Sequence, residues 1–373
     1  MRDKVAIYGA NGQIGFLILE ELLCSKLYTP VAIVRSNLAS IILREKLGKN
    51  FEIVVADVMT DDLNDIIKDC NYIINASLAS GNGIKKDRNI NLGIFNNILR
   101  KNKLIKYIHL SSVAVYGLSK SSTFINPKPH NSYGQEKLFH ENFIKNKFKK
   151  NNISYVILRV GHLYTKGASL SNYIHSCEKE NKFRVPFLNS KSNFVSKPRL
   201  VLGVLESLNS KYKNCTFNLT DDPNKTYKQI FRFHFTRETN ILYLSQHEAL
   251  IARKAAYSEL NLTSKIFKSL IIGLKNSLRD VFENDSFRKI LDYIIRNSPE
   301  KLEHLIRRKY RVKMVKSQIR DYKDNIQYKY PDFFFWPPVP GNQIITKTVE
   351  DEDLNDEKKN LYTWYDKISY DID

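Results

Sequence analysis

The stretch VAIYGANGQIG, residues 5–15, decides the fold of this chain. Its first four residues form a short apolar run of the kind found in a buried strand. Gly9, Gly12 and Gly15 follow at intervals of three, and residues 16–23 continue with apolar side chains at helical spacing. Gly9 permits a tight turn, Gly12 lets backbone N–H groups approach a pyrophosphate, and Gly15 lets the helix pack closely on the sheet. The stretch therefore predicts a dinucleotide-binding turn, and its flanking strand and helix disfavour an ordinary glycine-rich loop.

Strand and helix patterns go on alternating after this turn. The sequence predicts a turn at residues 28–30, helices near residues 61–69, 88–101 and 132–145, and strands at residues 31–34, 51–55, 72–75, 106–112, 153–160 and 216–219. Such alternation is typical of an α/β fold with a Rossmann-type, doubly wound parallel sheet. We expect this domain at residues 1–165, with its sheet completed by about residues 194–220. Residues 166–193 and 221–373 would form a smaller, mainly helical C-terminal substrate-binding region.

The composition is that of an ordinary globular protein, with 42% hydrophobic residues and a mean hydropathy of −0.39 over 373 residues. The stretch before the strand predicted at Val5 does not resemble a secretory signal, so we expect none. No apolar run approaches the ~18–20 residues that a membrane span needs. The four cysteines are far apart and form no metal-type pairs, which predicts reduced thiols, a cytoplasmic location and no metal site.

The net charge of +20 raises the question of nucleic-acid or membrane binding. Lysine is abundant along the whole chain without a separate basic tail, so we favour a compositional origin and expect no nucleic-acid partner. The basic patch at residues 307–313 is interpreted as a solvated helix face. Residues 266–282 have apolar side chains at helical spacing. We expect that helix to dock on its own domain, with contact to a membrane surface as the less favoured alternative.

The end of the second predicted strand bears on cofactor choice. An Asp or Glu normally holds the adenosine ribose hydroxyls about 20 residues past the glycine motif. Arg35 and Ser36 stand there instead, and a guanidinium can pair with a 2′-phosphate that a carboxylate would repel. We therefore predict NADP, with NAD as the alternative if Arg35 is only a solvated loop charge. Asp57, after the third strand, could accept hydrogen bonds from the adenine amino group.

Tyr133 and Lys137 stand four residues apart in the helical stretch SYGQEKLFHENFIK, so their side chains share one face. A lysine ammonium beside a tyrosine, together with an oxidised nicotinamide ring, favours the phenolate form that a general base needs. Ser112 ends the predicted strand at residues 106–112 and could hydrogen-bond the same substrate oxygen as Tyr133. A YxxxK pair alone carries little weight, but a strand-terminal serine and the glycine motif precede this one.

These motifs resemble those of the extended short-chain dehydrogenase/reductase family, the NAD(P)-dependent epimerase/dehydratase group that acts largely on nucleotide sugars. The resemblance covers about the first 165 residues and includes GANGQIG, NLGIFNNIL, SSVAVYG, the YxxxK pair and LRVGHLY. It implies that Ser112, Tyr133 and Lys137 are the catalytic triad and that Asn91 supports the lysine through a water-linked network. The cofactor-binding set predicted from the motifs and the resemblance comprises Gly9, Asn11, Gly12, Gln13, Ile14, Gly15, Arg35, Ser36, Asp57, Val58, Ala76, Ser77, Tyr133 and Lys137.

The resemblance also distinguishes reaction types. Nucleotide-sugar dehydratases carry an acidic residue just before the VYG segment, where this chain has Val113 and Ala114, so 4,6-dehydration is disfavoured. Epimerisation and net reduction remain, and Arg35 slightly favours reduction because an epimerase often retains NAD. In the loop expected after residue 160, His162 is a candidate substrate contact. Candidates for binding a nucleotide diphosphate are Arg199 and, equally, Lys182, Arg184 and Lys191.

The sequence thus predicts an NAD(P)-dependent epimerase or reductase of a nucleotide-activated sugar, serving polysaccharide or glycan precursor synthesis. The in-class alternative is a reductase of a non-sugar ketone. A second alternative is a non-catalytic NADP-binding sensor or scaffold, which would have no need of Ser112, Tyr133 and Lys137. A homodimer is left open.

Overall fold

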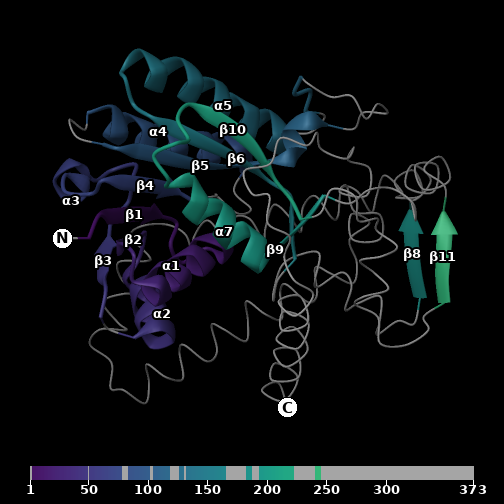
Figure 1. The fold of residues 1–373 in the computed structure, drawn as a ribbon, viewed down its shortest axis with the longest axis horizontal. Coiled ribbons are helices and arrows are strands. Elements are labelled where there is room, and N and C mark those ends of the chain that lie inside the picture. Colours follow the sequence, from purple (N-terminus) through teal and green to yellow (C-terminus); the bar gives the residue numbers. More distant parts are fainter. Residues whose placement is uncertain are drawn as a thin grey trace, which may run out of the picture. The chain divides into compact units, whose positions relative to one another are not determined.

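The computed structural model describes residues 2–48, 50–77, 83–100, 104–117, 126–129, 132–164, 182–186, 193–221 and 240–244 of the 373-residue chain (Figure 1). The chain divides into two compact units. The first unit holds a large sheet with its helices, together with a small sheet of β7 (His162–Tyr164) and β9 (Phe194–Ser196). In the second unit the described residues are β8 (Lys182–Pro186) and β11 (Asn240–Leu244), which pair in parallel.

The large sheet has seven strands in the order β10-β6-β5-β4-β1-β2-β3, and every neighbouring pair is parallel. The strand order reverses between β1 and β4, and ligands of such sheets bind outside the carboxyl ends of the strands at this point. The predicted doubly wound parallel sheet is therefore confirmed. Its strands are β1 (Lys4–Tyr8), β2 (Thr29–Val34), β3 (Glu52–Val55), β4 (Tyr72–Asn75), β5 (Lys106–Ser112), β6 (Tyr155–Val160) and β10 (Cys215–Leu219).

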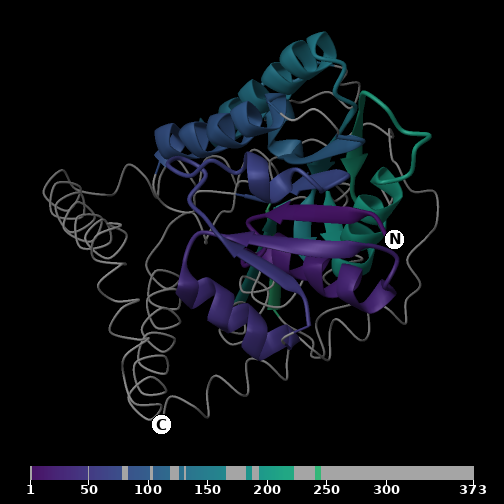
Figure 2. The ribbon, with the colours of Figure 1, turned by 90° about the vertical axis from the view of Figure 1, so that its left-hand side faces the viewer.

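Helices cover both faces of this sheet (Figures 1 and 2). One face carries α1 (Gln13–Ser25), α2 (Asn37–Leu47) and α7 (Lys197–Ser207). The other carries α3 (Asn64–Ile67), α4 (Gly83–Leu99) and α5 (Ser132–Lys150). A short 3-10 helix, η1 (Val113–Tyr116), directly follows β5.

Burial on both faces explains why the strands are almost continuously apolar. In β1, Val5 and Ile7 join the core cluster beneath α1 and α7, whereas Ala6 and Tyr8 join the cluster beneath α4 and α5. This alternation follows from the two-residue period of a strand. The two apolar clusters hold the sheet rigid, and its carboxyl edge can therefore position a functional site.

Several predicted boundaries are wrong for identifiable reasons. The expected turn at residues 28–30 is instead the start of β2, where Pro30 pairs with Val5; a proline is tolerated near a strand end. The helix expected at residues 61–69 shrinks to α3, because Asp61 and Asp62 accept backbone hydrogen bonds from residues 57 and 64. The helix expected from residue 88 already begins at Gly83.

α2 was not predicted from the sequence, although Ser36 marks its start: the Ser36 Oγ accepts a hydrogen bond from Ala39 N at 3.2 Å. In the C-terminal region, β8 and β11 form a strand pair where mainly helices were expected. The helix at residues 266–282 and the basic patch at residues 307–313 lie outside the described residues. The domain boundaries stay predictions.

Candidate active site

The glycine motif forms the turn between β1 and α1, and backbone geometry requires a glycine at positions 9 and 15. Gly9 has a φ of +73°, and a Cβ atom there would lie 2.9 Å from the Cα of Ser77. The Gly12 N–H donates to the Gly9 carbonyl at 2.9 Å. A Cβ atom on Gly15 would overlap that same Gly9 carbonyl, so the start of α1 lies against the end of β1.

The N-terminus of α1 fits a pyrophosphate. Gly12 occupies the N-cap position without a side-chain hydrogen bond, and the first turn contains no acidic residue. Asn11, Gly12 and Gln13 are exposed and Ile14 is partly exposed, so the turn is open to a ligand. Backbone N–H groups and the helix dipole at such a terminus favour an anion. The predicted cofactor contacts in this turn fit the geometry.

Two loops at the carboxyl ends of β2 and β3 carry the residues predicted for the adenosine end. Arg35 is exposed, whereas the Ser36 hydroxyl caps α2. The Asp57 Oδ1 accepts from Met59 N at 2.9 Å, which folds residues 57–61 into a turn that also includes Val58. These contacts explain the loop shapes, and the cofactor contacts of Arg35, Ser36, Asp57 and Val58 stay predictions.

At the end of β4, Asn75 organises the loop that faces Gly9. Its Oδ1 accepts from both the N–H and the hydroxyl of Ser77, at 3.0 and 2.6 Å. Its Nδ2 donates to Asn91 Oδ1 and to Tyr107 Oη, each at 2.9 Å. Asn75 therefore fixes Ala76 and Ser77 beside the glycine turn. This role of Asn75 was not predicted from the sequence.

Asn91 is fully buried on α4, and its Nδ2 donates to the Asp87 carbonyl at 2.9 Å. Its Oδ1 is already bound by Asn75. Lys137 instead directs its Nζ toward the Leu110 carbonyl, 3.4 Å away. In the described part of the chain Asn91 and Lys137 share no direct hydrogen bond, and the water-linked contact implied by the resemblance stays a prediction.

The three residues predicted as the catalytic triad lie on two elements. Ser112 ends β5, and its Oγ accepts from Ala114 N at 3.2 Å within η1. Tyr133 and Lys137 lie one turn apart near the start of α5, with the lysine Nζ 5.8 Å from the centre of the tyrosine ring. Tyr133 is 38% exposed, whereas Lys137 is only 4% exposed. A solvent-accessible phenol next to a buried ammonium suits proton exchange with a bound ligand.

Gly134 brings these two elements together. A Cβ atom at Gly134 would lie 2.5 Å from the Ala114 carbonyl oxygen and 2.9 Å from the Cβ of Pro129. The first turn of α5 therefore rests directly on the backbone of η1. This contact places Tyr133, which directly precedes Gly134, beside the segment that follows Ser112.

The predicted substrate residues occupy different surroundings from those expected. His162 begins β7 rather than lying in a loop, and its N–H donates to Asn193 O at 2.7 Å. Burial lowers the pKa of His162 to about 3, so the ring is neutral at physiological pH. Arg199 is 6% exposed at the start of α7, and its Nε donates to Thr220 O at 3.1 Å.

Lys182 and Arg184 belong to β8, and Lys191 lies outside the described residues. Substrate contacts by these residues, by His162 and by Arg199 stay predictions. Among the described residues, no three His, Cys, Asp or Glu side chains are grouped as a metal ion would require. None of the described helices is long and apolar enough to cross a bilayer.

Comparison with known proteins agrees with this geometry. Residues 5–185 match the sequence model of the NAD dependent epimerase/dehydratase family. This stretch includes the glycine turn, Ser112, Tyr133 and Lys137. No curated protein sequence gave a significant match.

Solved structures share the fold at low sequence identity. A UDP-N-acetylglucosamine 4-epimerase from Methanobrevibacter ruminantium M1, in complex with UDP-N-acetylmuramic acid, is 21% identical with a TM-score of 0.54, over 66% of this chain and 86% of that one. A UDP-glucuronic acid 4-epimerase from Bacillus cereus, in complex with UDP-glucuronic acid and NAD, is 19% identical with a TM-score of 0.54, over 65% and 86%. The terminal R domain of the myxalamid PKS-NRPS biosynthetic pathway is 15% identical with a TM-score of 0.58, over 69% and 76%. At these identities the likeness shows the fold alone.

Proposed function

Because residues 5–185 belong to the NAD dependent epimerase/dehydratase family, we propose that this chain is an NAD(P)-dependent enzyme that epimerises or reduces a nucleotide-activated sugar. One observation carries the proposal. Tyr133 and Lys137 lie on α5, which packs against η1, the short helix that Ser112 caps. η1 follows β5, and β1 of the same sheet leads into the glycine turn. A protein that only sensed a dinucleotide would not need this arrangement.

In this proposal the bound nicotinamide cofactor supplies the hydride acceptor or donor. Tyr133 exchanges a proton with the sugar hydroxyl or keto oxygen, as a general base or acid. Ser112 donates a hydrogen bond to the same oxygen and so steadies it. The ammonium of Lys137 lies 5.8 Å from the centre of the Tyr133 ring and places a positive charge beside the reacting group. The same ammonium would hold the ribose hydroxyls.

The substrate class is supported by the ligands named for the solved structures, UDP-N-acetylmuramic acid and UDP-glucuronic acid. A role in polysaccharide or glycan precursor synthesis is the corresponding proposal for this chain. Val113 and Ala114, both buried in η1, have apolar side chains. Neither can therefore act as the acid that dehydration would need. We therefore propose epimerisation or reduction, without elimination of water.

The cofactor is a nicotinamide dinucleotide, and two observations favour different forms. The exposed Arg35 at the end of β2 favours the 2′-phosphate of NADP. NAD is the cofactor named for the Bacillus cereus epimerase. We retain NADP as the proposal for this chain because the guanidinium belongs to its own sequence.

A reductase of a non-sugar ketone is the second candidate function. A cytoplasmic location and a homodimer also remain proposals. Among the described residues, Cys24, Cys70 and Cys215 form no disulfide.

The test is incubation with a panel of UDP-sugars, keto sugars and non-sugar ketones, each with NAD or NADPH, followed by chromatography and mass spectrometry. An isomer without mass change would support epimerisation, and a gain of two mass units would support reduction. Loss of water from a sugar would contradict the exclusion of dehydration. Turnover of non-sugar ketones alone would favour the second candidate.

A further inference from the structure

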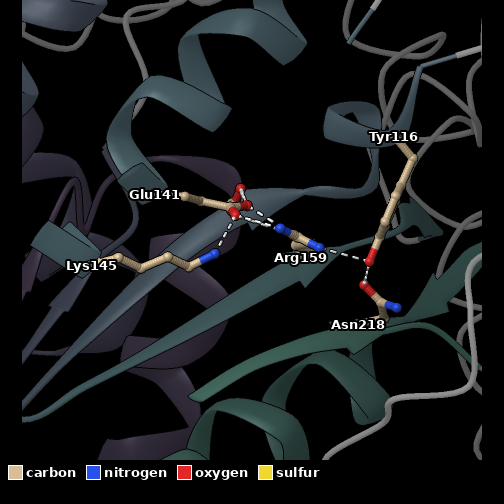
Figure 3. A network of polar contacts seen from close by, with 6 residues as sticks. Tyr116, Glu141, Lys145, Arg159 and Asn218 are labelled. Carbon is tan, nitrogen blue, oxygen red and sulfur yellow. Dashed lines mark hydrogen bonds and ion pairs between the residues drawn. The ribbon is translucent and has the colours of Figure 1, made fainter. Parts of the chain in front are cut away.

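A buried polar network that the proposed chemistry does not use joins the elements around the candidate site (Figure 3). It links five elements: β5, η1, α5, β6 and β10. Its members are Ser111, Tyr116, Glu141, Lys145, Arg159 and Asn218. All of them except Lys145 are buried.

The centre of this network is an ion pair between α5 and β6. The Arg159 Nη2 donates to Glu141 Oε2 at 2.6 Å, and Nε lies 3.0 and 3.2 Å from the two carboxylate oxygens. Ser111 adds a hydroxyl donor to Glu141 Oε1 at 2.6 Å. Burial lowers the pKa of Arg159, but the hydrogen bonds and charge of Glu141 outweigh it and raise the pKa overall. The Arg159 guanidinium therefore stays charged in the core.

Tyr116 extends the network from this ion pair to β10. The Arg159 Nη1 lies 2.7 Å from Tyr116 Oη, and Tyr116 Oη lies 2.8 Å from Asn218 Oδ1. A guanidinium can only donate, so the phenol oxygen accepts from Arg159 and its hydrogen goes to Asn218. Figure 3 shows the tyrosine reaching down from η1 toward both partners.

The network acts on both elements that carry the predicted catalytic residues. Ser112 caps the start of η1 through Ala114 N, and Tyr116 ends the same four-residue helix. Fixing Tyr116 therefore fixes the turn that holds the Ser112 hydroxyl. On α5, Glu141 lies one helical turn after Lys137, so its ion pair fixes that helix on β6.

We propose that Tyr116 is a positioning residue that sets the Ser112 hydroxyl, while Glu141 and Arg159 hold α5 and η1 in mutual register. This inference rests on the proposed function for its catalytic consequence. Catalysis is sensitive to such placement, since a shift of about 1 Å in reacting groups can cost roughly 10²-fold in rate. The Tyr116 phenol accepts from one N–H of the buried guanidinium and thereby links the ion pair to the end of η1.

The test compares Tyr116→Phe with Tyr155→Phe as the matched control. Both remove one hydroxyl from a buried tyrosine, but Tyr155 lies at the amino end of β6, far along the strand from Arg159. We expect Tyr116→Phe to lower kcat about 10-fold or more, with KM and cofactor Kd changed less than about 2-fold. Amide hydrogen exchange in residues 110–117 should become faster in Tyr116→Phe than in the control.

Two further variants keep the test decisive. Asn218→Ala removes the acceptor of the Tyr116 hydrogen and should reproduce the loss in kcat, and the double variant should lose little more. Equal kcat in Tyr116→Phe and Tyr155→Phe, or unchanged exchange in residues 110–117, would overturn the positioning role. If wild-type protein converts no substrate of the panel, the proposed function fails, and the exchange measurement alone still decides whether the network holds the Ser112 turn.

Discussion

Gly9 combines two constraints that can be separated by substitution. Its φ is +73°, and a Cβ atom would also meet the Ser77 backbone at 2.9 Å. Gly48 has a similar φ of +86° with no atom within 4 Å of its Cβ position. We expect both Gly9→Ala and Gly48→Ala to lose about 1–3 kcal/mol in the free energy of unfolding. Only Gly9→Ala should also weaken cofactor binding, measured by calorimetric titration. Equal cofactor affinity in the two variants would contradict the proposal that the glycine turn binds the cofactor.

Arg35 is the residue on which the preference for NADP depends. Arg35→Gln removes the charge that would pair with a 2′-phosphate, so we expect the NADP Kd to rise about 10-fold while the NAD Kd changes little. Lys147→Gln, at an exposed position in the last turn of α5, is the control for lost net charge. An unchanged ratio of the two dissociation constants in Arg35→Gln would assign selectivity to other residues.

At the scale of elements, the contact between α5 and η1 is the feature that assembles the candidate site. Gly134→Ala would place a methyl group 2.5 Å from Ala114 O and should push the helix away from the Ser112 turn. We expect kcat to fall about 10-fold or more. Gly203→Ala is the control, because its methyl group would also lie 2.5 Å from a neighbour between α7 and β10, although that neighbour is the Leu219 side chain and not a backbone atom.

Thermal unfolding should show destabilisation in both glycine variants. Only Gly134→Ala should lose activity per folded molecule. Comparable kcat in the two variants would show that the packing of α5 on η1 does not control the chemistry.

The sequence predicted the elements whose pattern is local. The glycine turn, β1, β4 and β5 follow from apolar runs bounded by turn residues, and the YxxxK spacing needs only one helical turn. The family and the enzyme class inferred from these motifs are confirmed by the match of residues 5–185. Pro30 and the aspartates near residue 61 were misjudged because tertiary pairing and side-chain hydrogen bonds overrode local propensity.

Long-range polar partners could not be predicted. Glu141 and Arg159 are 18 residues apart, and Tyr116 and Asn218 are 102 apart. In the sequence, the two members of a buried polar pair cannot be distinguished from other polar residues, because no local pattern shows which strand will face which helix. His162 was misplaced for the same reason, because β7 forms only by pairing with β9, more than thirty residues later.

For the whole molecule, buried histidines predict a loss of stability in acid. Burial lowers the pKa of His140 to about 3, and burial and the charge of Lys137 hold the pKa of His109 well below its usual value. Glu136 lies 3.3 Å from His140 Nε2 and would favour the imidazolium, but Arg88 binds both of its carboxylate oxygens. Burial therefore prevails, and both rings are neutral in the fold.

Unfolded histidines bind protons below about pH 6.5, whereas these two do not in the folded state, so stability falls as the pH drops from there toward 3. We expect a loss of about 3 kcal/mol between pH 6.5 and 5 from the pair together. Urea unfolding at both pH values measures it, and His140→Leu should reduce the measured difference by about 1.5 kcal/mol, the contribution of one such histidine. A pH dependence that is identical in wild type and His140→Leu would show that His140 titrates normally.

The central claim is that Tyr133 exchanges a proton during hydride transfer with a bound nicotinamide cofactor, and Tyr133→Phe tests it most directly. The measurement is the turnover of the substrate identified from the panel, made alongside the cofactor Kd of wild type and variant. We predict that kcat falls at least about 10²-fold while the cofactor Kd changes far less, because the other cofactor contacts remain. Undiminished turnover in Tyr133→Phe, or a wild-type protein that binds neither NAD nor NADP, would contradict it.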